Sequence, residues 1–194
     1  MNAWVEAFVL AGGKSSRMGS DKGLKHLIGK PMVSYVLNAL EGTDIPLNII
    51  ANDNAYRSFG FPVYGDVVKE KGPMGGLLTA FANSEAEVVF LVSCDMPLIS
   101  SEAIKELLKL ADREKIIAAT VEEMVNPLFA LYPVILKADV EKRIFSGRLK
   151  MTDFILENKH TLVPSIARDF PGIFRNVNNE EELKMTEKEW NNLK

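Results

Sequence analysis

The stretch Leu10-Ala-Gly-Gly-Lys-Ser-Ser-Arg-Met-Gly-Ser-Asp-Lys22 is the most informative part of this sequence for predicting the fold. It follows an apolar run that is typical of a buried β-strand. Gly12 and Gly13 allow the chain to turn sharply with no Cβ in the way of a ligand. Arg17 and Lys22 add two cations to a loop rich in free backbone N–H groups. Such a loop at the carboxyl end of a strand predicts a polyphosphate site.

Two familiar phosphate-binding loops do not match this stretch. A Walker A loop needs a glycine five residues before its Gly-Lys-Ser/Thr, and Phe8 stands at that place ahead of Gly13. The dinucleotide fingerprint G-x-G-x-x-G also fails, because the glycines fall at positions 12, 13 and 19. Spacing alone leaves an ordinary glycine-rich turn between strand and helix as the alternative. The two cations and Asp21 favour phosphate binding over it.

Composition sets the broad class of the protein. The chain has 194 residues, 47% of them hydrophobic and 25% charged, which predicts one globular domain over residues 1–194. The net charge of −3 gives no reason to expect nucleic acid as a partner. Cys94 is the single cysteine, so an internal disulfide is excluded and a reducing cytoplasm is expected. We expect neither a secretory signal nor a membrane span, which needs about 20 apolar residues.

Strands and helices are predicted to alternate along the chain. Apolar runs predict strands at residues 5–10, 47–51, 62–64, 87–93, 115–120, 126–132 and 160–166. Helical spacing predicts helices at residues 33–40, 74–82, 104–111, 135–145 and 151–157, and one that starts near residue 178. The alternation predicts an α/β fold of three layers, α/β/α, with a mostly parallel central sheet. Ligands of such sheets bind at the carboxyl ends of the strands.

Some local signals refine these elements. Ser100 or Ser101 is expected to cap the helix near residues 104–111. The spacing Asn178-x-x-Glu181 predicts a capping box at the last helix. The pair Gly75-Gly76 inside a predicted helix indicates a close backbone approach, to a ligand or to the sheet.

Asp95 is the strongest single candidate for a metal-binding residue. It follows the predicted strand at residues 87–93, so it is expected at the same sheet edge as the glycine-rich loop. A carboxylate that faces a polyphosphate makes sense if Mg²⁺ lies between them, because Mg²⁺ binds one or two carboxylates together with phosphate oxygens. The alternative is a turn aspartate ahead of Pro97. Asn52 and Asp66 also end predicted strands, and each is either a ligand for a base or ribose or a turn residue.

Several segments resemble one known family. The pattern Leu10-Ala-Gly-Gly-x-Ser-x-Arg-Met-Gly-x-Asp-Lys22 is similar to the signature loop of the molybdenum cofactor guanylyltransferases, a branch of the nucleotidyltransferases. Cys94–Pro97 resembles their metal-binding segment, and Gly72–Gly76 resembles their second glycine-rich loop. The resemblance covers nearly the whole chain. It implies a Rossmann-like nucleotidyltransferase fold, with a nucleotide-binding half at about residues 1–100 and a pterin-side half at about 101–194.

The resemblance also implies roles for residues. The positions that match nucleotide-binding positions of the family are Leu10, Ala11, Gly12, Gly13, Lys22, Asn52, Asp66 and Asp95. Arg17, Lys22 and Asp95 are the implied catalytic residues, with Asp95 as the metal ligand. Asn176 and Asn178 match a motif on the pterin side, although an N-cap at Asn178 would explain one of them. Arg148 and Lys150 are either pterin-phosphate contacts or part of an exposed turn.

The implied reaction is transfer of GMP from MgGTP to the terminal phosphate of molybdopterin, with release of pyrophosphate. A phosphate monoester with a second pKa of about 6 is mostly ionised at neutral pH, so the reaction needs no general base. The partners are then GTP and molybdopterin, with transient contacts to other molybdenum-cofactor proteins. The alternatives are a CTP-dependent molybdopterin cytidylyltransferase, a sugar-phosphate nucleotidyltransferase, or a non-catalytic nucleotide or cofactor carrier. Gly12-Gly13 favours guanylyl transfer by resemblance.

Overall fold

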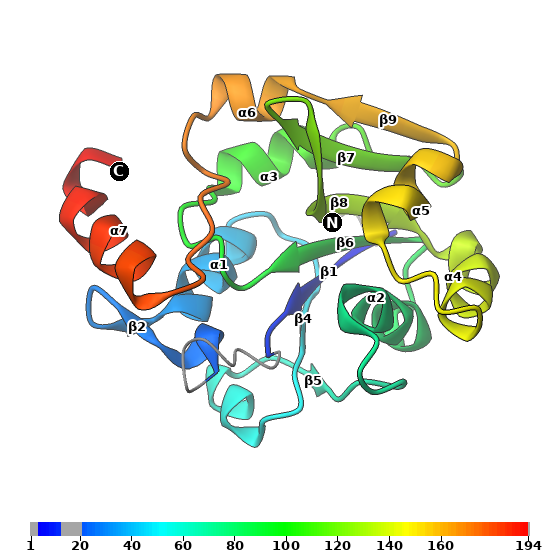
Figure 1. The fold of residues 1–194 in the computed structure, drawn as a ribbon, viewed down its shortest axis with the longest axis horizontal. Coiled ribbons are helices and arrows are strands. Elements are labelled where there is room, and N and C mark those ends of the chain that lie inside the picture. The colour runs from blue at the N-terminus through cyan, green and yellow to red at the C-terminus, as the bar shows by residue number, and fades with distance from the viewer. Residues whose placement is uncertain (1–3, 13–20, 194) are drawn as a thin grey trace.

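The structure, a computed structural model, describes residues 4–12 and 21–193. Its central sheet contains seven strands in the described ranges: β1 (Val5–Leu10), β4 (Leu47–Ile50), β5 (Val63–Tyr64), β6 (Val88–Ser93), β7 (Ile116–Val121), β8 (Met124–Pro133) and β9 (His160–Val163). They lie in the order β5-β4-β1-β6-β8-β7-β9 (Figure 1). Only β8 runs antiparallel to its neighbours β6 and β7, and the other pairs are parallel. The prediction of a mostly parallel sheet is confirmed.

Helices cover both faces of this sheet. The helices α1 (Met32–Glu41), α3 (Ser101–Leu108) and α6 (Ser165–Asp169) pack on one face, and α2 (Gly72–Asn83), α4 (Lys137–Phe145) and α5 (Met151–Glu157) pack on the other (Figure 1). Alternate residues of β1 point to opposite cores: Ala7 and Val9 to the first, Phe8 to the second. The predicted three-layer arrangement is therefore confirmed. A short 3₁₀ turn at Val134–Leu136 leads into α4.

The C-terminal helix α7 (Glu180–Leu193) lies outside these layers, against a small hairpin of β2 (His26–Leu27) and β3 (Lys30–Pro31) (Figure 1). A third apolar cluster joins them: Leu27, Met32, Val177 and Leu183, with Tyr35 and Trp190 packed against it. The rings of Tyr35 and Trp190 meet edge to face with centroids 4.8 Å apart. Lys25 forms an ion pair with Glu180 across the same contact. The last part of the chain is thereby fixed beside an early segment.

Several boundaries differ from the sequence prediction, and two of them have a local cause. The strand predicted at residues 160–166 ends at Val163, because Pro164 has no N–H for the ladder and instead precedes α6. The helix predicted at residues 104–111 runs from Ser101 to Leu108, with Ser100 as its cap: its side chain accepts the N–H of Ala103 at 3.2 Å.

The predicted capping box is displaced by one residue. Asn179 Oδ1, not Asn178, accepts the N–H of Glu182 at 2.8 Å, and the Glu182 carboxylate accepts the N–H of Asn178 at 2.6 Å. The prediction on Asn178 and Glu181 was wrong because the Asn178 side chain is engaged elsewhere.

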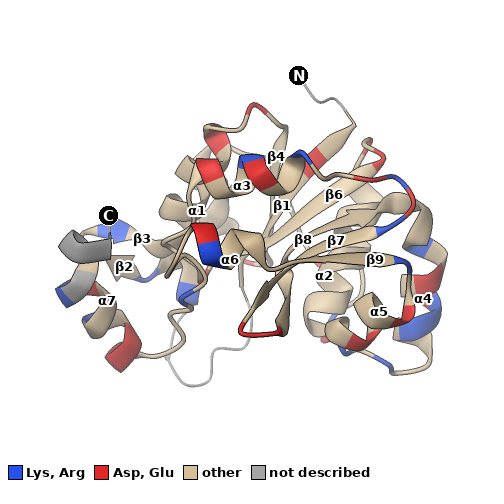
Figure 2. Ribbon diagram, turned by 90° about the horizontal axis from the view of Figure 1, so that it is seen from above, with Lys and Arg blue, Asp and Glu red and all other residues tan. Residues whose placement is uncertain are grey.

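Charges of both signs are spread over the surface helices (Figure 2). None of the helices described here combines the length and the apolar character that a bilayer crossing requires.

Candidate active site

Three neighbouring parallel strands, β4, β1 and β6, end at one edge of the sheet. Leu10 lies opposite Ile50 in one register and opposite Ser93 in the other. The ladder continues one step past the strands, since the Ala11 N–H donates to Ile50 O at 2.9 Å and the Cys94 N–H donates to Leu10 O at 3.0 Å. The segments after the strands therefore begin side by side. This edge carries most of the residues that the sequence singled out.

Lys22 contacts two other predicted site residues. Its Nζ donates to Asn178 Oδ1 at 2.6 Å and lies 3.7 Å from Asp95 Oδ2. The side chains of Lys22 and Asp95 are 26% and 16% exposed, so both remain accessible at the edge. The Val177 N–H also donates to the Asp95 carbonyl at 2.9 Å, which fixes the late segment next to the end of β6. Residues separated by 156 positions thus meet around one ammonium group.

A short 3₁₀ turn, Lys22–Leu24, carries this lysine. Asp21 caps the turn: its carboxylate accepts the Gly23 N–H at 3.0 Å and the Tyr56 hydroxyl at 2.5 Å. Gly12 has φ of +96°, a conformation that favours glycine, and it lies next to the Asp21 carboxylate. Through these contacts Asp21 orders the turn that carries Lys22. Tyr56 carried no sequence signal, because its part depends on packing between distant segments.

Cys94 lies directly before Asp95 and is 5% exposed. Burial raises the pKa of its thiol to about 12, and the carboxylates of Asp95 and Asp21 act in the same direction. The thiol therefore stays protonated at neutral pH. A packed apolar role is the better interpretation of this residue than a nucleophilic one.

Asn52 and Asp66 form a reciprocal pair beyond β4 and β5. Asn52 Nδ2 donates to Asp66 Oδ2 at 2.8 Å, and the Asp66 N–H donates to Asn52 Oδ1 at 3.1 Å. Asn52 is exposed and Asp66 is half-buried. The structure thus joins these two predicted residues to each other at the same sheet edge. Their part in binding a base or ribose remains a prediction.

The structure shows what the glycine pair Gly75-Gly76 of α2 approaches, which the sequence left open between a ligand and the sheet. A Cβ on Gly76 would lie 2.4 Å from Leu10 Cδ2, and one on Gly75 would lie 2.9 Å from Lys71 Cβ. The close approach at Gly76 is therefore to a side chain of β1, and the sheet explains it. The helix also starts at Gly72, two residues before the predicted boundary.

Some predicted residues are not part of this cluster. Gly13 and Arg17 lie outside the described residues. Asn176 is exposed next to the cluster. Arg148 pairs with Glu157, and Lys150 Nζ lies 2.9 Å from Asp153 Oδ1. Both of these cations are thus engaged with carboxylates of α5.

Among the described residues, Asp95 is the candidate ligand for a divalent metal at the edge. In residues 4–12 and 21–193, no three His, Cys, Asp or Glu side chains gather closely enough to hold a metal together. Asp95 offers a partly exposed carboxylate beside the cationic turn. One carboxylate completed by phosphate oxygens and water is a usual environment for Mg²⁺. Asp95 therefore fits such an ion when a polyphosphate is present.

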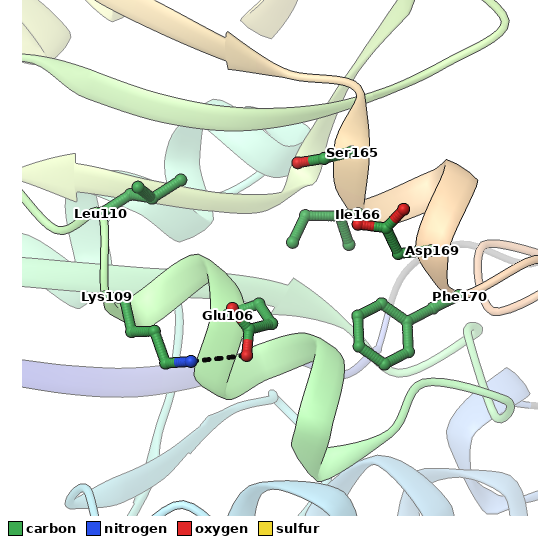
Figure 3. Close-up of a pocket in the computed structure, with 7 residues that line it drawn as sticks. All are labelled: Glu106, Lys109, Leu110, Ser165, Ile166, Asp169 and Phe170. Atoms are coloured by element: carbon green, nitrogen blue, oxygen red, sulfur yellow. Dashed lines mark hydrogen bonds and ion pairs between the residues drawn. The ribbon is translucent and has the colours of Figure 1, made fainter.

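A surface hollow of about 330 Å³ lies elsewhere, between α3 and α6 (Figure 3). Its lining is formed by Glu106, Lys109, Leu110, Ser165, Ile166, Asp169 and Phe170. None of the predicted site residues that the structure describes is among them. The hollow is therefore separate from the ends of β4, β1 and β6, where those residues lie.

A cation, a carboxylate and a glycine turn at the carboxyl edge of a parallel α/β/α sheet define a nucleotide-binding protein of the doubly wound class. The family model described as MobA-like NTP transferase domain matches residues 7–160. The chain belongs to this family of nucleotidyltransferases.

Relatives with curated names agree over almost the whole length. A molybdenum cofactor guanylyltransferase from Haemophilus influenzae is 33% identical over 192 residues, which covers 96% of this chain and 99% of the relative. One of the same name from Shewanella pealeana is 33% identical over 188 residues, 94% of this chain and 93% of the relative. The crystal structure of molybdopterin-guanine dinucleotide biosynthesis protein A from Archaeoglobus fulgidus has a TM-score of 0.80 at 20% identity. It covers 96% of this chain and 99% of its own, and it shows the shared fold.

Proposed function

We propose that this protein transfers GMP from GTP to the terminal phosphate of molybdopterin, giving molybdopterin guanine dinucleotide and pyrophosphate. Family membership and the names of relatives that match over 90% of the chain support this activity. The structural observation that carries it is the cluster of Lys22, Asp95 and Asn178. The Lys22 ammonium lies within contact distance of both other side chains, and we assign Lys22 to phosphate, Asp95 to the metal and Asn178 to the molybdopterin side.

The residues of this chain supply alignment and charge. Lys22 binds the triphosphate of GTP, and Arg17 of the same loop is proposed as a second phosphate ligand. Asp95 would hold Mg²⁺, which when bound neutralises charge on the triphosphate. A terminal phosphate oxygen of molybdopterin attacks the α-phosphorus, the bond from α-phosphorus to the bridging oxygen breaks, and pyrophosphate leaves. The attacking phosphate is mostly ionised above its second pKa of about 6, so no side chain has to remove a proton.

The remaining residues bind the two substrates on either side of this centre. Ala11 and Gly12 present backbone to the phosphates, while Asn52 and Asp66 face the nucleoside. Asn176 and Asn178 lie on the molybdopterin side. Lys22 stands between the sides, because it already contacts Asn178 from the turn that follows the nucleotide loop. Its position would bring donor and acceptor phosphates to the same cation.

Pyrophosphate release from GTP in the presence of molybdopterin and Mg²⁺ tests this function. Asp95→Asn is expected to lower kcat at least about 100-fold, the size typical of a lost electrostatic contact in a transition state. Asp153→Asn, which changes a carboxylate paired with Lys150 on α5, is the matched control and keeps wild-type turnover. Undiminished turnover in Asp95→Asn would remove the metal-binding assignment.

Replacing GTP by CTP tests the choice of nucleotide. We expect at least 10-fold higher kcat/KM with GTP. Equal or better turnover with CTP would contradict guanylyl transfer and favour a cytidylyltransferase. Nucleotide binding without pyrophosphate release would contradict catalysis altogether.

A further inference from the structure

Tyr56 is buried beneath the turn that carries Lys22, and its hydroxyl has a specific acceptor there. It lies in the 3₁₀ helix Asn54–Phe59 and is 0% exposed. Its OH donates to Asp21 Oδ1 at 2.5 Å. Burial raises the pKa of this phenol, with Cys94 and Asp21 adding to the effect, so the hydroxyl remains a donor at neutral pH. A buried tyrosine hydroxyl needs a hydrogen-bond partner, and here that partner is the residue directly before Lys22.

Asp21 transmits this contact to the backbone on either side of Lys22. The same Oδ1 atom that accepts the Tyr56 hydroxyl also accepts the Gly23 N–H at 3.0 Å. Lys22 is the residue between Asp21 and Gly23. Its backbone is therefore held at both neighbours by one carboxylate, and that carboxylate is itself held by Tyr56.

Gly23 closes the same arrangement from the other side. A Cβ on this glycine would lie 2.4 Å from the Tyr56 hydroxyl oxygen and 3.2 Å from Cys94 Sγ. Gly23 therefore packs directly against the Tyr56 hydroxyl, and this contact fixes the position of the turn relative to the sheet edge. From this turn the Lys22 side chain reaches Asn178 and Asp95.

We propose that Tyr56 is a positioning residue for Lys22, acting through Asp21 on the turn Lys22–Leu24. The proposal rests on the proposed function, in which Lys22 binds the triphosphate. Tyr56 touches neither substrate. It fixes the direction of the ammonium group before GTP arrives, which lowers the cost of ordering it in the transition state.

The variant Tyr56→Phe removes the hydroxyl and keeps the ring. We expect kcat for pyrophosphate release to fall about 10-fold, within the range that a small misplacement of a binding group produces. Tyr132→Phe is the matched control. Its hydroxyl is also fully buried and donates to Pro127 O at 2.8 Å, but it lies in the core on the other face of the sheet. This control keeps kcat within twofold of wild type.

A double-mutant cycle separates positioning from general weakening of the fold. In a Lys22→Met background, adding Tyr56→Phe is expected to change kcat less than twofold, because the group that Tyr56 positions is already gone. A further 10-fold loss in that background would overturn the proposal. Asp21→Ala provides a second route, since it removes the acceptor and should reproduce the loss seen in Tyr56→Phe.

Amine labelling read by mass spectrometry gives an outcome that does not depend on turnover. Lys22 is expected to react with acetic anhydride at least threefold faster in Tyr56→Phe, relative to Lys159, whose side chain is 79% exposed. Unchanged labelling of Lys22 would overturn the positioning role even if kcat fell. If the wild-type protein released no pyrophosphate, the proposed function would fail, while faster labelling would still support the structural link from Tyr56 to Lys22.

Discussion

Lys22 differs from an ordinary surface lysine in having two acceptors of different kinds. Asn178 offers a neutral amide oxygen at 2.6 Å, and Asp95 offers a carboxylate oxygen at 3.7 Å. Lysine side chains lose about 2 kcal/mol of conformational freedom when they are fixed in one geometry. Part of that cost is already met before a substrate binds. A triphosphate would therefore meet an ammonium group that is largely oriented.

Gly23→Ala tests how tightly the turn rests on the core. The added Cβ would lie 2.4 Å from the Tyr56 oxygen, so we expect a loss of about 1–3 kcal/mol in the free energy of unfolding. Urea denaturation measures it. Gly65→Ala is the control, because its Cβ would meet only Asn52 Oδ1 at 3.4 Å, an ordinary contact. Equal losses in the two variants would show that the contact with Tyr56 yields easily.

The residues of the site were predictable to different degrees. Lys22 stands out from the sequence as a cation of the glycine-rich loop, and Asp95 stands out because it follows the predicted strand at residues 87–93. Tyr56 does not, since nothing near it in the sequence indicates a partner 35 positions earlier. Gly23 resembles any other loop glycine in the sequence, and only the structure shows that it packs against the Tyr56 hydroxyl oxygen. The roles of Tyr56 and Gly23 depend on packing between segments that are distant in the sequence, and local sequence patterns do not predict such packing.

At the scale of elements, the apolar attachment of α7 rests, among its described side chains, on Leu183 and Trp190. Leu183 is 8% exposed in a cluster with Leu27, Met32 and Val177. Leu183→Ala is expected to lower the free energy of unfolding by about 2–3 kcal/mol. It should also raise amide hydrogen exchange in α7 more than in the strands of the sheet. Hydrogen exchange with mass spectrometry measures both.

Leu108→Ala is the control for this variant. Leu108 is 7% exposed in α3 and packs in the main core, so its loss should lower global stability without selective exchange in α7. Exchange in α7 that rose equally in both variants would contradict its separate attachment.

Long elements were predicted from their apolar patterns, and so was the two-residue strand β5, but other short elements were not. The strands β1 and β6 and the helices α1 and α5 match their predicted positions within one or two residues. The hairpin of β2 and β3 was missed because neither of its two-residue strands, His26–Leu27 and Lys30–Pro31, contains a run of apolar residues. The displaced capping box has a similar cause: Asn178 and Asn179 both suit an N-cap, and the tertiary contact with Lys22 decides between them.

At the scale of the whole molecule, buried tyrosines predict alkaline instability. Burial raises the pKa of Tyr56 and of Tyr132 above the ordinary value of 10.0. The folded state keeps protons that the unfolded chain releases, so this contribution to stability is full below about pH 10 and falls as pH rises further. In that range, each rise of one pH unit lowers the free energy of unfolding by about 1.4 kcal/mol for each of these tyrosines.

Urea denaturation between pH 8 and pH 11 checks this expectation. Tyr132→Phe should reduce the slope above pH 10 by the share of one tyrosine and leave it unchanged below pH 9. A slope above pH 10 equal to that of the wild type would show that Tyr132 ionises freely in the folded protein.

The contact between Lys22 and Asn178 also has a consequence for biosynthesis. Every strand of the described sheet precedes residue 164, whereas Val177 and Asn178 follow it. A ribosome makes the chain from its N-terminus, so the layered core can form while these two residues are still inside the exit tunnel. The binding centre is then completed only after residues 177 and 178 have left the ribosome. A nascent chain would pass through a stage that is folded but not yet competent to engage its substrates.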